Sequence, residues 1–351
     1  MLEKIKEFLL EIVSIDTSDG EDAGIYYVEE RFKEIGVNNI TLQYIDDKAL
    51  NLIVNDIEKP DLLIATHIDT IPPRIPLMML GNGKIKGTGA IDAKGSVAAI
   101  YALFLKNFRL PNNVSIAIFS GEETTSSGCY KYLDNHRPQN VLVMEPTDLN
   151  LALGSYGYVE VDVFSYGYGR HPDLFSNLED YEEKEDPVRK IIKFLSYIDS
   201  ITKTFNTRYS ITRFEAKGDI YSTPSLGMTT LNILVPPGVD VLEIIRGILR
   251  ESAKVEGLKV KINDYWGSFT LEDESFKNIL TETYTKTFQE KPRHYIMKGW
   301  TDASLFAKRG IPSSIFGPGK PELAHTVDEV IDTHDIMKAA DFLEKLIEKF
   351  R

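Results

Sequence analysis

The chain has 351 residues, 42% of them hydrophobic, which is enough for two globular domains of ordinary composition. It carries 53 acidic and 40 basic residues, and this net charge of -13 excludes a general attraction for nucleic-acid phosphate. The single cysteine, Cys129, excludes an internal disulfide and a thiolate zinc cluster.

The first half of the chain alternates helix-like and strand-like segments. Apolar residues three and four apart predict helices, and short runs rich in Val and Ile predict strands. The predicted elements are helices at 2–13, 22–35 and 96–108 and strands at 50–54, 62–65, 114–119 and 141–144. This alternation is typical of an α/β domain, in which helices cover both faces of a mostly parallel or mixed sheet. Ligands of such domains bind beyond the carboxyl ends of the strands.

The pattern changes after Gly154, where residues 158–164 alternate with period two, as in a half-exposed strand of a separate antiparallel sheet. Two rough β-α-β passes follow, with helices at 187–197 and 241–251 and strands at 208–214, 228–234 and 258–262. They predict a small α+β, ferredoxin-like domain inserted into the larger one. Helices at 275–289 and 336–349 then resume the first pattern. We therefore expect one domain of residues 1–155 and 265–351 and an inserted domain of residues 156–264.

The N-terminal segment is amphipathic and contains no unbroken apolar run of signal-peptide length. No later stretch is long and apolar enough to cross a bilayer. A cytoplasmic, soluble protein without a membrane partner is therefore expected.

Histidines and carboxylates stand at the ends of several apolar runs. His67 and Asp69 follow the strand at 62–65 two residues apart, so an extended chain points them to the same side. A carboxylate placed there can hold the second ring nitrogen of a metal-bound imidazole. Alone, the pair would more simply be a strand-end histidine beside a turn aspartate. Asp92 lies between a glycine-rich turn and a helix start, where it could equally be a helix N-cap.

Two adjacent acids, Glu122 and Glu123, end the apolar run IAIFSG. They would repel each other unless a cation neutralised them, so one can bind a metal while the other takes a proton from metal-bound water. A solvated helix start explains the pair alone equally well. Glu145 ends VLVMEPTD, and His325 lies in a loop whose glycines and prolines can bring it to the sheet edge. The remaining histidines outside the inserted domain, His136, His294 and His334, are predicted to be surface residues.

The motifs THIDT, GTGAIDAKG, SGEE, MEPTD and WTDASLFAKRGIPSSIFGPG…AHTVDE together resemble, in order and spacing, the two-zinc aminoacylase and deacylase peptidase family. This family includes acetylornithine deacetylase, succinyl-diaminopimelate desuccinylase, carrier-protein lysine and ornithine hydrolases, dipeptidases and carboxypeptidases. The resemblance implies a zinc-peptidase-like catalytic domain, with a mixed sheet covered by helices. The inserted domain would be a lid that in many members also dimerises.

The resemblance also implies roles for single residues. His67 and Glu145 would bind one zinc ion, Glu123 and His325 the other, and Asp92 would bridge the two. Cobalt or manganese could take the place of zinc. The catalytic residues would be Glu122 as the general base, Asp69 as the group that orients His67, and His171 as the oxyanion donor of the lid.

The sequence departs from the family pattern in the lid. The residues after His171 differ from the usual motif, and Leu234 occupies the place of an arginine that many relatives carry. The substrate carboxylate would then bind another basic residue, and the candidates are Arg170, Arg213, Arg293 and Lys298. Each of the four could equally be a solvated surface charge.

We therefore expect a metal-dependent amide hydrolase that removes the acyl group from an N-acyl amino acid. Acetylornithine, acetyl-lysine and related intermediates of lysine or arginine biosynthesis are the expected substrates, either as small molecules or as an acylated carrier protein. A homodimer is expected. The alternatives are a metal-dependent dipeptidase or carboxypeptidase and, from a different class, an inactive metal-bound scaffold. The spare carboxylate of Glu122 argues against a scaffold, because binding alone does not require it.

Overall fold

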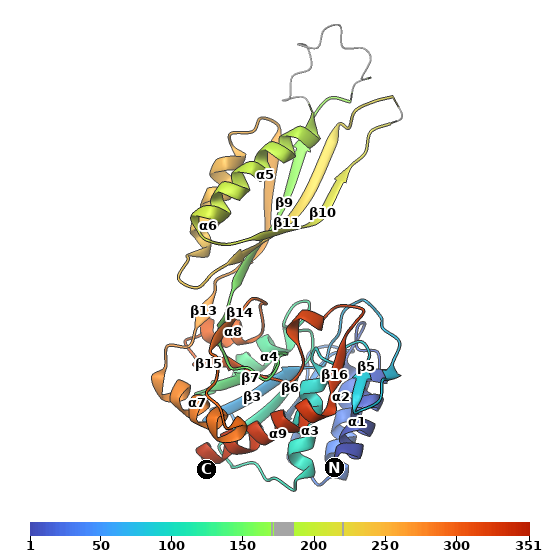
Figure 1. Cartoon of the computed structure of the whole chain (residues 1–351), viewed down its shortest axis with the longest axis vertical. Helices are drawn as coiled ribbons and strands as arrows, with labels where there is room; N and C mark the ends of the chain where they lie inside the picture. Colours follow the sequence, from blue (N-terminus) through green and yellow to red (C-terminus); the bar gives the residue numbers. More distant parts are fainter. Residues whose placement is uncertain (170, 172–185, 220) are drawn as a thin grey trace. The chain divides into compact units, whose positions relative to one another are not determined.

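The computed structural model describes residues 1–169, 171, 186–219 and 221–351 of the chain. Arg170, one of the predicted substrate ligands, lies outside these described residues. The chain divides into two units (Figure 1). The larger unit comprises Met1–Gly154, Thr270–Met297 and Thr301–Arg351, and the smaller unit comprises Ser155–Phe269 and Lys298–Trp300.

A mixed sheet forms the centre of the larger unit. Its strand order among the described residues is β1-β2-β6-β3-β7-β15-β8-β13, and β14 pairs with β8. Strands β3, β6, β7 and β15 run parallel to one another. Strand β2 pairs with β6 in antiparallel orientation, and β1 pairs with β2 in the same way. The strands are β1 (Ile40–Tyr44), β2 (Leu50–Val54), β3 (Leu62–His67), β6 (Val114–Phe119), β7 (Val141–Val143), β8 (Ala152–Ser155), β13 (Phe269–Thr270), β14 (Tyr295–Met297) and β15 (Ser313–Ile315).

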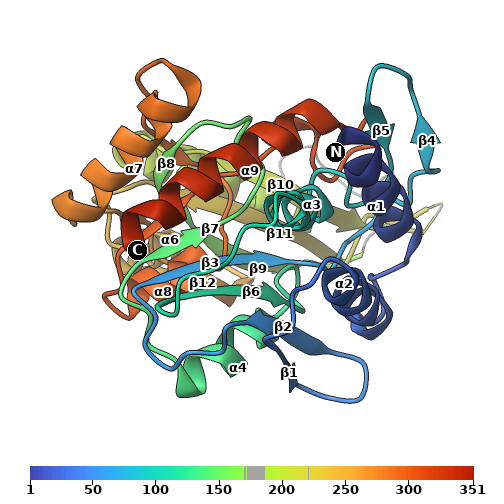
Figure 2. The ribbon, with the colours of Figure 1, turned by 90° about the horizontal axis from the view of Figure 1, so that it is seen from below.

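Helices cover both faces of this sheet (Figure 2). One layer contains α1 (Leu2–Ser14), α3 (Lys94–Leu105), α7 (Glu274–Phe288) and α9 (Thr333–Ile347), which contact one another. The opposite face carries α4 (Ser127–Asn135) and α8 (Ala303–Lys308), and α2 (Asp22–Glu34) packs against α1 and β2. The middle strands β2, β3, β6 and β7 are buried along their whole length, which explains why they read as continuous apolar runs.

A small antiparallel sheet joins two loops of the larger unit. It has the order β16-β5-β4, with β4 at Met78–Met79, β5 at Lys84–Lys86 and β16 at Val330–Asp332. The pairing of β5 with β16 brings the segment after Met79 beside the segment after His325.

The smaller unit is a four-stranded antiparallel sheet with two helices. Its elements follow the order β9 (Gly157–Tyr166), α5 (Pro187–Thr204), β10 (Tyr209–Ala216), β11 (Leu226–Val235), α6 (Val241–Ser252) and β12 (Leu258–Trp266). Alternate residues of β9 and β11 are buried, and side chains such as Val161 and Leu231 form a core with Phe194 and Ile248 of the helices. The β-α-β-β-α-β order and the strand order β10-β11-β9-β12 are those of a ferredoxin-like fold.

The predicted fold class, a mixed sheet covered by helices plus an inserted α+β unit, is confirmed. None of the helices in the described ranges combines the length and the apolar character needed to cross a bilayer. The predicted surface position of His136 is wrong, because this residue is only 6% exposed. It stacks on Tyr132 and its Nε2 lies 2.7 Å from Asp56 Oδ1. A histidine in a polar stretch of sequence can be buried when its ring finds both an aromatic and a carboxylate partner.

Candidate metal centre

Three neighbouring parallel strands deliver most of the predicted site residues to one edge of the sheet. His67 is the last residue of β3, Glu122 and Glu123 follow β6 after a two-residue turn, and Glu145 follows β7 by two residues. Strand β3 lies between β6 and β7 in the sheet. The carboxyl ends of parallel strands meet at the same edge, so these side chains converge although they are far apart in the sequence.

Asp92 and His325 reach the same edge from two loops. Asp92 precedes α3, and His325 lies in the left-handed region (φ 59°) of the loop between β15 and β16. His67 Nε2 lies 3.1 Å from Asp92 Oδ1 and 3.6 Å from Glu145 Oε2. His325 Nε2 lies 3.2 Å from Asp92 Oδ2 and 2.7 Å from Glu123 Oε1. The five predicted metal ligands therefore lie together, and each oxygen of Asp92 faces a different imidazole.

These residues form two overlapping groups that can each hold a cation. One is His67, Asp92 and Glu145, the other is Asp92, Glu123 and His325, and in each group the candidate ligand atoms lie within 4.8 Å of one another. Two imidazoles and three carboxylates are donors that suit zinc, and also cobalt or manganese. The arrangement matches a pair of metal sites that share Asp92.

The electrostatics of the cluster also fit a metal centre. Glu145 Oε1 is buried and accepts no hydrogen bond from the described residues. Burial raises the pKa of Glu145 to about 8 and that of Glu122 well above its usual value. Burial would also raise the pKa of Asp92, but hydrogen bonds to His325 and His67 hold it well below its usual value. Bound cations would offset the cost of burying so many carboxylates. The residues present therefore fit the two metal ions expected from the sequence.

Asp69 makes contacts to both sides of the site. Its Oδ1 lies 3.3 Å from His67 Nδ1, on the side of the ring away from Asp92. The same carboxylate accepts the backbone N–H of Glu122 at 3.1 Å and that of Glu123 at 2.8 Å. The sequence suggests the first contact through the two-residue spacing to His67. It gives no signal for the second contact, which depends on the pairing of β3 with β6.

Glu122 lies beside the candidate metal ligands without belonging to them. Its side chain is 8% exposed, and Oε2 lies 4.0 Å from His67 Nε2. It belongs to neither candidate metal group, whereas its neighbour Glu123 contacts His325. A carboxylate beside the metal ligands but outside both groups is available for proton transfer.

The other predicted site residues are not part of either candidate metal group among the described residues. Most of them belong to the smaller unit. His171 is half-buried there and stacks on Tyr221, with ring centroids 5.6 Å apart. Arg213 is exposed on β10 and donates two hydrogen bonds to Glu215, at 2.7 and 2.9 Å. Lys298 is exposed in the smaller unit, and Arg293 is exposed in the larger one. Their roles in binding a substrate stay predictions.

Two buried acids near the cluster are absent from the predicted site. Glu329, 3% exposed, accepts hydrogen bonds from the loop that carries Asp92. Asp302 is 2% exposed, burial raises its pKa to about 7, and its Oδ1 accepts no hydrogen bond from the described residues. Both residues stand inside motifs noted above, AHTVDE and WTDAS, but the sequence does not show what they contact.

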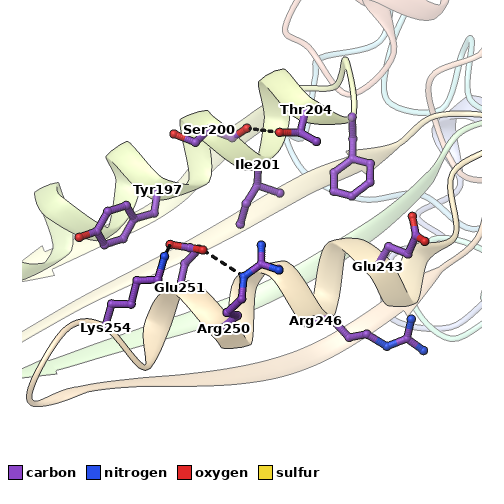
Figure 3. A pocket seen from close by; sticks show the side chains of 11 residues that line it. Tyr197, Ser200, Ile201, Thr204, Glu243, Arg246, Arg250, Glu251 and Lys254 are labelled. Carbon is purple, nitrogen blue, oxygen red and sulfur yellow. Dashed lines mark hydrogen bonds and ion pairs between the residues drawn. The ribbon is translucent and has the colours of Figure 1, made fainter.

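A groove in the smaller unit is lined by none of the predicted site residues. This groove of about 710 Å³ lies between α5 and α6 of the smaller unit (Figure 3). Its walls include Tyr197, Arg246 and Arg250, and Glu251 forms ion pairs there with Arg250 and Lys254. Neither candidate metal group of the described residues lies in this groove.

Known proteins resemble this chain along most of its length. Residues 63–349 match Peptidase family M20/M25/M40. An uncharacterized metallohydrolase of Methanocaldococcus jannaschii is 27% identical, over 98% of this chain and 97% of its own. A putative LysW-lysine/LysW-ornithine hydrolase of Pyrococcus abyssi is also 27% identical, over 99% of this chain and 94% of its own. The LysW-lysine/LysW-ornithine hydrolase of Sulfurisphaera tokodaii is 27% identical, over 96% and 92%.

Solved structures share the fold along the whole chain. A tripeptidase from Staphylococcus aureus superposes with a TM-score of 0.79 at 19% identity, covering 99% of this chain and 98% of its own. A metallo-carboxypeptidase from Sulfolobus solfataricus gives a TM-score of 0.74 at 18% identity, with 97% of each chain covered. The predicted family is thereby confirmed: this chain belongs to Peptidase family M20/M25/M40 and is a metallohydrolase of that family.

Proposed function

We propose that this metallohydrolase cleaves an amide bond and removes the acyl group from the nitrogen of an N-acyl amino acid. The observation that carries the proposal is the position of Asp92 between the two imidazoles, with Glu122 beside them and outside both metal groups. A pair of metal sites with a spare buried carboxylate is suited to hydrolysis, because one group binds and the other moves a proton.

In the proposed site, His67 and Glu145 hold one metal ion, Glu123 and His325 hold the other, and Asp92 holds both. The bound pair, which we expect to be zinc, would polarise the scissile carbonyl and lower the pKa of water. Glu122 takes the proton of the attacking water and passes it to the leaving nitrogen, which departs as an amine. Burial supports this role, since it makes the Glu122 carboxylate a stronger base than an exposed glutamate.

The substrate that we propose is an N-acylated amino acid related to lysine or ornithine. The support comes from relatives of similar length whose names are LysW-lysine/LysW-ornithine hydrolase. At 27% identity these relatives indicate a substrate class to test. Turnover of acetylornithine, acetyl-lysine, succinyl-diaminopimelate, carrier-protein-linked lysine and simple dipeptides separates the deacylase from a dipeptidase. Preferential cleavage of the dipeptides would contradict the proposed substrate class.

For the smaller unit, we propose the role of a lid that also forms a homodimer. Strand β10 is an edge strand, and its exposed Ile211 and Phe214 can be covered by a second copy. His171 is proposed to donate a hydrogen bond to the substrate oxyanion. The variant His171→Ala should lower kcat with metal affinity unchanged, and an unchanged kcat would remove His171 from the mechanism.

The sharpest test of the proposed chemistry is Glu122→Ala. Loss of a general base costs about 10²–10⁴-fold in rate, so turnover should fall by that factor while metal content stays near two ions per chain. Glu123→Ala is the contrasting variant, because it should lose the metal ion that Glu123 shares with His325. Glu30→Ala, at an exposed glutamate of α2, is the control for the loss of one acidic charge. Wild-type turnover by Glu122→Ala would refute the assignment.

A further inference from the structure

Glu329 binds the backbone of the loop that carries Asp92. Its carboxylate is buried, and Oε1 accepts the N–H of Ile91 at 2.9 Å and that of Asp92 itself at 3.1 Å. Oε2 accepts the N–H of Gly89 at 3.2 Å. The three hydrogen bonds from backbone N–H groups to this buried carboxylate are strong, because the acceptor is charged.

The loop held in this way is rich in glycine. It contains Gly87 and Gly89, and glycine-rich backbone has many accessible conformations. Gly89 adopts a positive φ of 76°, and a Cβ there would approach Thr70 Cγ2 to 2.5 Å. The Thr88 hydroxyl fixes the start of the loop, because it accepts the N–H of Ile75 and donates to Pro73 O. The N–H groups closer to the metal ligand, those of Gly89, Ile91 and Asp92, are bonded to Glu329. Asp92 has to present one oxygen to His67 and the other to His325.

Glu329 also belongs to the loop that carries the second imidazole. It lies four residues after His325, and its backbone N–H donates to Thr326 O at 3.3 Å. Its carbonyl oxygen accepts the N–H of Gly87 at 3.2 Å, and the Thr326 hydroxyl donates to Leu323 O at 2.9 Å. Through its backbone and its side chain, Glu329 joins the Asp92 loop to the His325 loop just before β16 begins.

We propose that Glu329 is a positioning residue that fixes Asp92 relative to both imidazoles and so sets the affinity of both metal sites together. The inference rests on the proposed function, in which Asp92 is the shared ligand. Glu329 contacts neither imidazole in the described structure and acts through the backbone of residues 89–92. Groups that orient metal ligands in this way typically control metal affinity about 10–100-fold.

The test is metal binding by Glu329→Gln, titrated with Zn²⁺ and with Co²⁺ after the protein has been depleted of metal. A glutamine keeps an oxygen for Ile91 and Asp92 but turns an NH₂ group toward the N–H of Gly89. We expect both ions to bind about 10–100-fold more weakly, and the visible spectrum of bound Co²⁺ to change. Asp328→Asn is the matched control, because it removes the same charge one residue away, where the exposed carboxylate contacts Lys86.

The pattern across variants separates positioning from a general loss of stability. His325→Ala should weaken one ion and leave the other, whereas Glu329→Gln should weaken both. Urea unfolding of the metal-depleted proteins shows whether each variant folds. If Glu329→Gln does not fold, Glu329→Asp keeps the charge but is too short to reach all three N–H groups, and it should show the same joint weakening. Wild-type affinity at either site in a folded Glu329 variant overturns the proposal.

Asp92→Asn, measured in parallel, distinguishes this inference from the proposed function. If Asp92→Asn binds metal as the wild type does, the shared-ligand site is wrong and the proposed function fails. If Asp92→Asn weakens both ions while Glu329→Gln binds them normally, only the positioning role fails.

Discussion

Replacing Asp69 by asparagine tests how a single carboxylate supports both halves of the site. Asp69 faces His67 Nδ1 at 3.3 Å and accepts the N–H groups of Glu122 and Glu123 at 3.1 and 2.8 Å. An asparagine has one acceptor oxygen, and its NH₂ group can only donate. Asp69→Asn therefore cannot serve all three donors with its side chain. Either the imidazole keeps only the backbone carbonyl of residue 69, which lies 3.2 Å from Nδ1, or the turn at Glu122 and Glu123 loses an acceptor.

The size of the effect follows from the lost contact. A hydrogen bond to a charged group contributes about 1.5–3 kcal/mol. A change in a group that orients a metal ligand lowers metal affinity about 10–100-fold, which corresponds to about 1.4–2.8 kcal/mol. The two estimates agree, so we expect Asp69→Asn to bind the metal ion at His67 about 10–100-fold more weakly. Turnover should fall as well at saturating metal, because the same carboxylate holds the backbone of Glu122.

The assay is metal titration of the depleted protein, followed by kcat at metal saturation. Asp56→Asn is the matched control, since Asp56 contacts His136 Nε2 at 2.7 Å in the same kind of aspartate–histidine pair. His136 belongs to neither candidate metal group, so Asp56→Asn should leave metal affinity and kcat unchanged. Wild-type affinity and kcat in Asp69→Asn would refute the reasoning, because the carboxylate would then support neither ligand nor base.

Three further predictions test the two metal groups, the packing and the electrostatics of the larger unit. Glu145→Gln should reduce tightly bound metal from two ions to one, as measured by elemental analysis after dialysis. Gly128→Ala should lower the free energy of unfolding by about 1–3 kcal/mol in urea, because its Cβ would approach Asn51 Oδ1 to 2.4 Å and Ser120 O to 2.6 Å. Burial raises the pKa of Glu21 to about 7, so its stability contribution is present below pH 4.5 and is lost as pH rises through 7. Glu21→Gln should therefore stabilise the protein more at pH 8 than at pH 5, and an equal gain at both values would contradict this pKa.

The sequence predicts the central strands β2, β3, β6 and β7 of the larger unit, because these strands are buried along their whole length. Continuous apolar runs such as Leu62–His67 and Val114–Phe119 have no helical period and end at polar residues. Once these runs are taken as parallel strands, the convergence of His67, Glu122 and Glu145 follows from the geometry of the sheet. The pairing of Asp92 with both imidazoles does not follow from the sheet. That pairing is implied by the family resemblance, because neither loop shows the hydrophobic periodicity from which a helix or strand could be predicted.

What the sequence does not predict depends on contacts between segments that are distant along the chain. The Asp69 carboxylate meets the N–H groups of Glu122 and Glu123 only because β3 and β6 are neighbours. Glu329 meets the Asp92 loop only because β16 pairs with β5. His136 is buried because Asp56 and Tyr132 supply partners for its ring. In each case residue type and spacing are compatible with a solvated surface position, and the tertiary structure decides.

The buried acids at this edge of the sheet fall into two groups, which differ in whether backbone N–H groups donate hydrogen bonds to their carboxylates. Asp69 and Glu329 together accept five backbone N–H groups, so peptide dipoles stabilise both charges. Among the described residues, the carboxylates of Asp92 and Glu123 are hydrogen-bonded to imidazoles but to no backbone N–H, and Glu145 retains a buried oxygen without a hydrogen-bond donor. A buried charge without such donors is costly unless a cation compensates it. The acids bonded to backbone are therefore suited to position the site, and those left without backbone donors are suited to hold metal, a distinction that the residue types alone do not make.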